Sequence, residues 1–174
     1  MAKLIKNRQI TDDNWQVMDL AEDDTPEGAA VPEGPVLVPL TVWLAQRDAL
    51  AARDDVGVWL AGDEEPGELA DDIGRLPLIA VNFPKFADGR GYSIAVLLRS
   101  RYGYSGELRA IGDVLRDQFN YLSRCGFDAL QPREGRYSDA ELEAALANFD
   151  DFKEPYQASV KPQNPLFRRA QRAA

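Results

Sequence analysis

The residues best suited to chemistry lie between Asn82 and Ser93, in the stretch NFPKFADGRGYS. Lys85 and Arg90 supply positive charge, and two glycines allow a ligand to approach the backbone closely. Free amides at the start of a following helix would complete a cradle for phosphate, sulfate or sulfite. The alternative is that the segment from Asp88 to Gly91 is only a turn with a helix cap.

A second stretch, RAIGDVLRD from Arg109 to Asp117, also joins a predicted strand to a predicted helix. Asp113 could cap that helix or accept a proton during catalysis. Capping is favoured, because the sequence shows no second group that would act with Asp113 in proton transfer. Arg109 and Arg116 could instead belong to a network of ion pairs. Nine basic and six acidic residues lie between Lys85 and Arg136, a basic excess that is more typical of a docking face than of a catalytic centre.

Several common kinds of active site are excluded by composition. The chain has no His and a single Cys, so it cannot build a Ser-His-Asp triad or a zinc or iron-sulfur ligand set. The spacing of the glycines matches neither a dinucleotide-binding fingerprint nor a Walker motif. We therefore expect no metal and no evident cofactor, and we expect Cys125 to be a buried, inert thiol.

Charge further limits the partners. The 174 residues carry a formal net charge of -9, which makes sequence-independent binding of nucleic acid unfavourable. The acidity is concentrated in residues 1 to 80, which contain 17 acids and 6 bases, whereas residues 81 to 174 contain 12 acids and 14 bases. A local anion site or docking face is thus expected in the second part of the chain.

The pattern from residue 36 onward is typical of an α/β fold, because short apolar runs alternate with stretches of helical spacing. We predict a mostly parallel sheet of about five strands with crossover helices, either an open sheet or a partial barrel, preceded by a short N-terminal β element. The predicted strands are 36–40, 56–60, 78–83, 107–111 and 127–130, and the predicted helices are 41–53, 66–75, 92–102, 114–125 and one that begins at Ser138.

The ends of the chain are predicted separately. The N-terminal element is expected to turn at Thr11 to Asn14, and residues 155–174 are expected to form an extended basic tail after a single domain, 1–154. No apolar run reaches the length of about 18 residues that a membrane span needs, and the first ten residues are too polar for a signal peptide. The expected location is the cytoplasm, with no membrane partner.

The phrases FPKFADGRGYS and RAIGDVLRDQ, within residues 36 to 130, resemble the signature region of a bacterial family of uncharacterised proteins. That family carries an oxidoreductase label and is encoded beside assimilatory sulfite reductase. The resemblance implies an accessory role in sulfite reduction, with sulfite reductase or its electron donor as partner. It supplies no catalytic residues, so the candidates chosen by position are Lys85, Asp88, Arg90, Arg109, Asp113 and Arg116.

Two other functions remain open at this stage. One is an enzyme or binding domain that takes a small anion or a phosphorylated ligand at the loop around Lys85. The other is a flavin-dependent oxidoreductase, which agrees with the label of the family but with no motif in the sequence.

Overall fold

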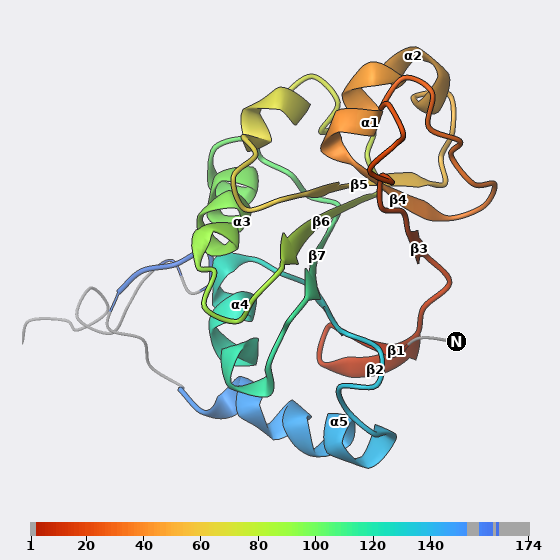
Figure 1. The fold of residues 1–174 in the computed structure, drawn as a ribbon. Coiled ribbons are helices and arrows are strands. Elements are labelled where there is room, and N and C mark those ends of the chain that lie inside the picture. Colours follow the sequence, from red (N-terminus) through yellow and green to blue (C-terminus); the bar gives the residue numbers. More distant parts are fainter. Residues whose placement is uncertain (1–2, 153–156, 162, 164–174) are drawn as a thin grey trace, which may run out of the picture.

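The fold is built on one sheet of eight strands, seen in a computed structural model that describes residues 3–152, 157–161 and 163 (Figure 1). Six strands, β3 to β8, are parallel and follow one another in chain order, whereas β1 and β2 form an antiparallel hairpin whose first strand pairs antiparallel with β8. The strands are β1 (Lys3–Lys6), β2 (Gln9–Asp12), β3 (Gln16–Val17), β4 (Val36–Pro39), β5 (Val56–Leu60), β6 (Leu78–Phe83), β7 (Glu107–Gly112) and β8 (Ala129–Pro132).

The sheet is curled into a partial barrel, and its topology requires this. Its two edges are β2 and β3, and only Asp13, Asn14 and Trp15 separate them in the chain. Four residue steps reach at most about 14 Å, whereas the edges of a flat eight-stranded sheet would lie roughly 34 Å apart. The sheet must therefore bend until its edges approach each other, and Figure 1 shows the strands arranged around a ring.

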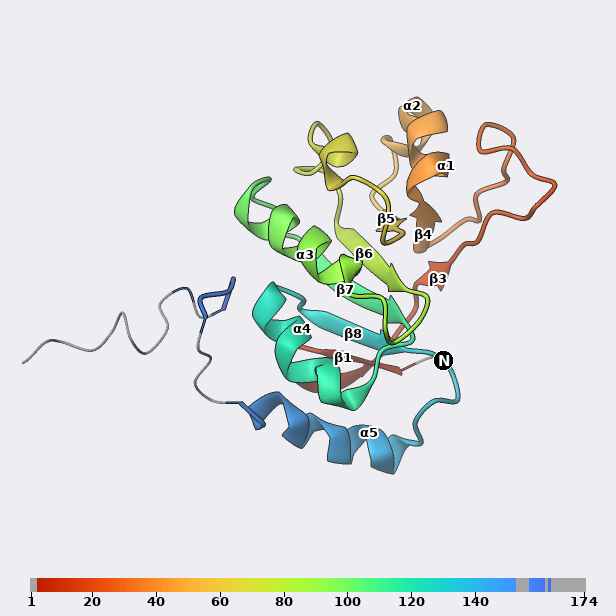
Figure 2. The ribbon, with the colours of Figure 1, turned by 60° about the vertical axis from the view of Figure 1, so that its left-hand side comes forward.

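The helices pack against the outer face of the curled sheet, where α3, α4 and α5 lie side by side (Figure 2). The α-helices are α1 (Leu40–Ala45), α2 (Arg47–Leu50), α3 (Arg90–Ser100), α4 (Phe119–Cys125) and α5 (Asp139–Ala145). Three short 3₁₀ helices accompany them: η1 (Pro66–Leu69), η2 (Arg116–Gln118) and η3 (Leu146–Asp150). In the described residues no helix has the length and apolar character needed to cross a membrane.

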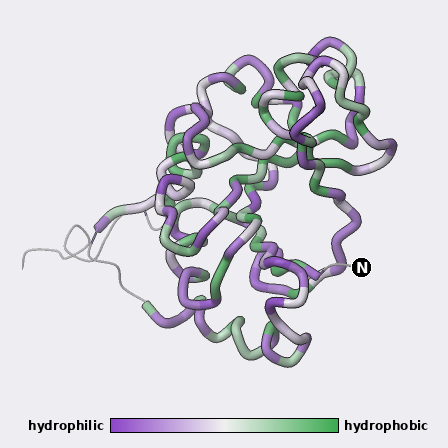
Figure 3. Tube along the Cα trace, viewed as in Figure 1, coloured by the Kyte–Doolittle hydropathy of each residue, from purple (hydrophilic) through white to green (hydrophobic). Residues whose placement is uncertain are grey.

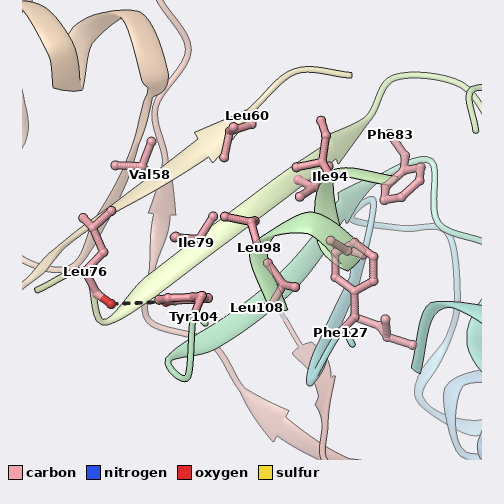
Figure 4. Close-up of a cluster of buried hydrophobic side chains, with 14 of the residues drawn as sticks. Val58, Leu60, Leu76, Ile79, Phe83, Ile94, Leu98, Tyr104, Leu108 and Phe127 are labelled. Carbon is pink, nitrogen blue, oxygen red and sulfur yellow. Dashed lines mark hydrogen bonds between the residues drawn. The ribbon is translucent and has the colours of Figure 1, made fainter. Parts of the chain in front are cut away.

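The main hydrophobic core fills the space between these helices and the sheet. Val58 and Ile79 from the strands pack with Leu98 from α3, and all three side chains are fully buried (Figure 4). A smaller cluster on the inner face contains Leu37, Leu78, Ala80 and Ile111, with Trp15 and Trp59 packed against it. Figure 3 shows hydrophobic residues concentrated in the strands and hydrophilic residues in the surrounding loops.

The prediction of an α/β fold with a mostly parallel sheet is confirmed, but the sheet has eight strands and not about five. All five predicted parallel strands exist, and β5 and β6 have the predicted bounds. The additional strands are the hairpin and β3, which the prediction had reduced to one short N-terminal element. Between the two predicted layouts, the structure has the partial barrel.

The N-terminal turn was placed wrongly. Thr11 belongs to β2 and pairs with Leu4, and the chain reverses instead at Asn7 and Arg8, whose φ angles are 50° and 65°. Two consecutive residues with positive φ are typical of the two-residue hairpin turn that matches the twist of paired strands. Asn tolerates this conformation, and the antiparallel pairing imposes it on Arg8.

Several predicted helix ends agree with the structure. Gly126 has a φ of 108° and ends α4, and Ser138 with Glu141 forms the predicted capping box at the start of α5. The predicted helix over 66–75 is only the short 3₁₀ helix η1, followed by turns. The predicted tail lies outside the described residues except for 157–161 and 163.

Candidate functional site

The interior of the partial barrel contains a buried arginine. The Arg109 side chain is 2% exposed, and its guanidinium donates to Asp13 Oδ2 at 2.9 Å and to Gln131 Oε1 at 3.0 Å. Two further bonds, at 2.7 and 2.9 Å, go to Glu107 Oε1, and the other oxygen of Glu107 lies 2.6 Å from Lys6 Nζ. The positive charges of Arg109 and Lys6 are thus balanced by the carboxylates of Asp13 and Glu107. Arg109 belongs to an ion network inside the barrel.

A pocket of about 270 Å³ opens at the mouth of the barrel, at the carboxyl ends of the parallel strands. Ligands of parallel α/β folds bind at this end because the loops that follow the strands gather there. We call it the mouth pocket; its lining comes from strands that are distant in sequence but adjacent in the ring. The lining residues are Val17, Asp19, Trp59, Asn82, Ile111, Gly112, Gln131, Pro132, Arg133 and Glu134.

Hydrogen bonds hold several of these side chains in place. The Trp59 indole Nε1 donates to Met18 O at 2.8 Å, which joins β5 to the segment after β3. Gln131 accepts the bond from Arg109 with its oxygen, so its amide nitrogen is left to donate elsewhere. One guanidinium nitrogen of Arg133 donates to Pro84 O at 2.9 Å, and this bond places the side chain across the end of β7.

The end of β7 depends on a glycine. Gly112 has a φ of 97°, a conformation that strongly favours glycine. A Cβ atom at this position would lie 2.4 Å from Phe83 O and 2.6 Å from Asn82 Oδ1. Gly112 thus lets the chain turn sharply over β6, where Asp113 N donates to Phe83 O at 2.7 Å.

The predicted anion cradle at the start of α3 holds a carboxylate of the chain itself. Asp88 accepts two hydrogen bonds from the Arg90 guanidinium, at 2.8 and 3.0 Å, and one from Arg90 N at 3.2 Å. These bonds lower the pKa of Asp88 to about 2. Gly91 serves packing, since a Cβ there would lie 2.7 Å from the Phe83 ring. The geometry at Asp88 is that of a local turn, and α3 begins after Gly89, which provides no side-chain cap.

The two predicted loops do meet at the carboxyl edge. Asp113 accepts a hydrogen bond from Phe86 N at 3.0 Å, and Gln118 Nε2 lies 3.4 Å from Phe86 O. Asp113 does not cap the following helix, whose N-cap is Leu115. It also lies 4.0 Å from an Arg136 guanidinium nitrogen. Its role in the structure is to connect the loop after β7 with the loop after β6.

The six candidates are therefore not gathered in one site. Lys85 and Arg116 are exposed at the carboxyl edge, Asp88 and Arg90 bind each other, and Arg109 lies inside the barrel. Cys125 is buried as predicted, and burial raises the pKa of its thiol. Within the residues that the structure describes, no three acidic or Cys side chains are grouped to hold a metal ion.

Residues 57–167 match the model of a family described as a bacterial protein of unknown function (DUF934). The match covers well over half of the chain. This chain belongs to the DUF934 family. The DUF934 range includes the mouth residues from Trp59 to Glu134 but not Asp13 or Asp19. Comparison with curated proteins and with solved structures gave no match.

Sequence reasoning missed most of the mouth pocket of this DUF934 protein. Trp59 lies within the predicted strand 56–60 and was not named as a candidate, and Gln131 and Arg133 follow the last predicted strand without any recognised motif. A usable signal was present in Asn82 and Gln131, because each is a polar residue near the carboxyl end of an apolar strand. Polar residues at such positions are placed for ligand contact in parallel α/β folds.

Proposed function

We propose that this DUF934 protein is an accessory protein of assimilatory sulfite reduction that docks onto sulfite reductase or its electron donor. The observation that carries the proposal is Phe86, an aromatic side chain that is 48% exposed on a loop whose backbone is held in place. The link to sulfite reduction comes from the resemblance of the two signature phrases to proteins encoded beside sulfite reductase.

The loop from Pro84 to Asp88, here called the docking loop, is preorganised for contact. Its backbone is bonded to Arg133 at Pro84 O and to Asp113 at Phe86 N, and Asp88 N donates to Lys85 O at 3.0 Å. A loop that is already ordered loses little conformational entropy when a partner binds. Rigid aromatic residues are the usual anchors of protein interfaces.

The charges around Phe86 favour an acidic partner. Lys85 is exposed beside it, and Arg116, Arg133 and Arg136 are exposed on the two adjoining segments. Such cations increase the rate of association with a negatively charged surface, and salt weakens the effect. The docking loop would thus combine an apolar anchor with electrostatic steering.

The test is association between the purified chain and its cognate sulfite reductase or electron donor at low salt, measured by gel filtration and calorimetry. Phe86→Ala should weaken binding about 30-fold, which corresponds to the loss of about 2 kcal/mol at an interface anchor. Tyr121→Ala is the matched control, because Tyr121 has the same exposed fraction but lies on α4. Absence of association by the parent chain, or equal weakening by both variants, would contradict the proposal.

A second candidate function is the binding of a small anion or phosphorylated ligand beside the docking loop. It is favoured by Lys85, which makes no ion pair with the described residues. Calorimetry with sulfite, sulfate and phosphate tests it. Lys85→Ala should abolish the binding signal, whereas Arg90→Ala should change it little because Arg90 is already bonded to Asp88.

A further inference from the structure

We propose that the mouth pocket binds a small α-amino acid as its zwitterion. The pocket combines one guanidinium and two carboxamides with two carboxylates, and these groups come from both sides of the ring of strands. This site lies inside the rim of the barrel and differs from the docking loop. The two sites share Arg133, whose side chain also donates to Pro84 O in the docking loop, but the inference does not require the docking function.

The size of the pocket sets the size of the ligand. Its volume of about 270 Å³ lies just below the range of roughly 300–1,000 Å³ found for drug-sized ligands. A space of this size suits a small metabolite. The polar character of the lining requires that this metabolite form several hydrogen bonds.

Hydrogen-bond donors for a ligand carboxylate come from β8 and the residues after it. The bond from Arg109 to Gln131 Oε1 settles the orientation of this amide, so the Gln131 nitrogen is the atom free to donate. Arg133 uses one guanidinium nitrogen for Pro84 O, and its main-chain nitrogen donates to Gly112 O at 3.1 Å. The other N–H groups of the Arg133 guanidinium can form charge-assisted hydrogen bonds to a ligand carboxylate.

Acceptors for a ligand ammonium group come from Asp19 and Glu134. Both are exposed and line the pocket, and neither forms an ion pair with the residues that the structure describes. Two carboxylates against one guanidinium give the lining a net negative charge, since Arg109 behind it is neutralised by Asp13 and Glu107. A free oxyanion such as sulfite would be repelled, whereas a zwitterion satisfies both signs.

An apolar part of the lining remains for a short side chain. Val17, Trp59 and Ile111 line the pocket beside the polar groups. Trp59 also provides a signal, because its indole is part of the wall and its fluorescence should respond to an occupant. These residues would contact the side chain of a bound amino acid.

The experiment is calorimetry of the full chain at pH 7 with each of the twenty common L-amino acids, supported by tryptophan fluorescence of the parent chain and of Trp59→Phe, because Trp15 and Trp43 also emit. We expect at least one small amino acid to bind, and acetate, ethylamine and sulfite each to bind at least tenfold more weakly. Binding by none of the twenty, or equally tight binding of acetate or sulfite, would overturn the proposal.

Variants then assign the binding to the pocket. Asp19→Asn and Arg133→Gln should each weaken binding at least tenfold, while the controls Asp24→Asn and Arg101→Gln, which lie outside the pocket, should leave it unchanged. Asp19 is exposed, and its side chain forms no hydrogen bond or ion pair with the part of the chain that the structure describes, so its substitution should not disturb folding. Unchanged affinity in Asp19→Asn, with binding retained in the parent chain, would place the amino acid elsewhere and refute the assignment.

Discussion

Removing Asp13 should strongly destabilise the partial barrel, because it leaves part of the Arg109 charge without its partner inside the ring. Both side chains are 2% exposed and lie 2.9 Å apart. Removal of one partner of a buried ion pair costs about 3–5 kcal/mol. Arg109 keeps its bonds to Glu107 and Gln131, so we expect a cost near the lower end, about 3 kcal/mol, for Asp13→Ala.

A double-mutant cycle separates this pair from its surroundings. Arg109→Met should cost at least as much as Asp13→Ala, because the buried Asp13 carboxylate then keeps only the bond from Trp15 N at 3.2 Å. The double variant contains neither buried charge, so its cost should be smaller than the sum of the single costs by about 2 kcal/mol, within the usual range for contacting residues. Glu107 would still be paired with Lys6 at 2.6 Å.

Urea unfolding at pH 7 measures all three free energies of unfolding, in low salt and in 1 M salt. A buried pair is screened little, so the coupling should persist at high salt. Asp150→Ala is the control, because its pair with Arg8 is exposed at both ends and should contribute less than about 1 kcal/mol. Additive costs within about 0.5 kcal/mol, or an Asp13 effect as small as the control, would refute the network.

Two further predictions concern the mouth and the core. Gly103→Ala should cost about 1–2 kcal/mol through its positive φ alone, because nothing lies within 4 Å of the added Cβ. Gly112→Ala should cost clearly more in the same urea assay because it also displaces Asn82, and an equal cost would contradict the close packing. Cys125 should react with a thiol reagent at pH 8 far more slowly in the native chain than in denaturant, since burial raises its pKa and blocks access; equal rates would contradict its burial.

The central strands were predictable because they are buried on both faces. Residues 56–60 and 78–83 are short, nearly continuous apolar runs, and this pattern is typical of parallel strands covered on both sides. The strand β3 was not predictable, because it has only two residues and both are exposed. Its parallel pairing with β4 joins Gln16 to Val36 across a long intervening loop, and no local pattern marks it.

The candidate site was predictable in its general place but not in its members. Parallel topology alone puts ligand contacts at the carboxyl ends of the strands, and the mouth pocket lies there. The role of Arg109 could not be read locally, because its partner Asp13 lies 96 residues away. Asp88 and Arg90 form a local pair two residues apart, so their mutual neutralisation was accessible from spacing.

The short segment that joins the two edges of the sheet connects the fold to the site. Asp13 lies in this segment and neutralises Arg109, and Arg109 in turn orients Gln131 toward the mouth. The chain that follows this link, from β3 to Asp19, supplies Val17 and Asp19 to the pocket wall. Met18 O accepts the hydrogen bond from the Trp59 indole. The residues matched by the DUF934 family begin only at residue 57. The pocket as a whole thus depends on an N-terminal segment outside that range, because this segment closes the curl, neutralises the interior and provides one wall.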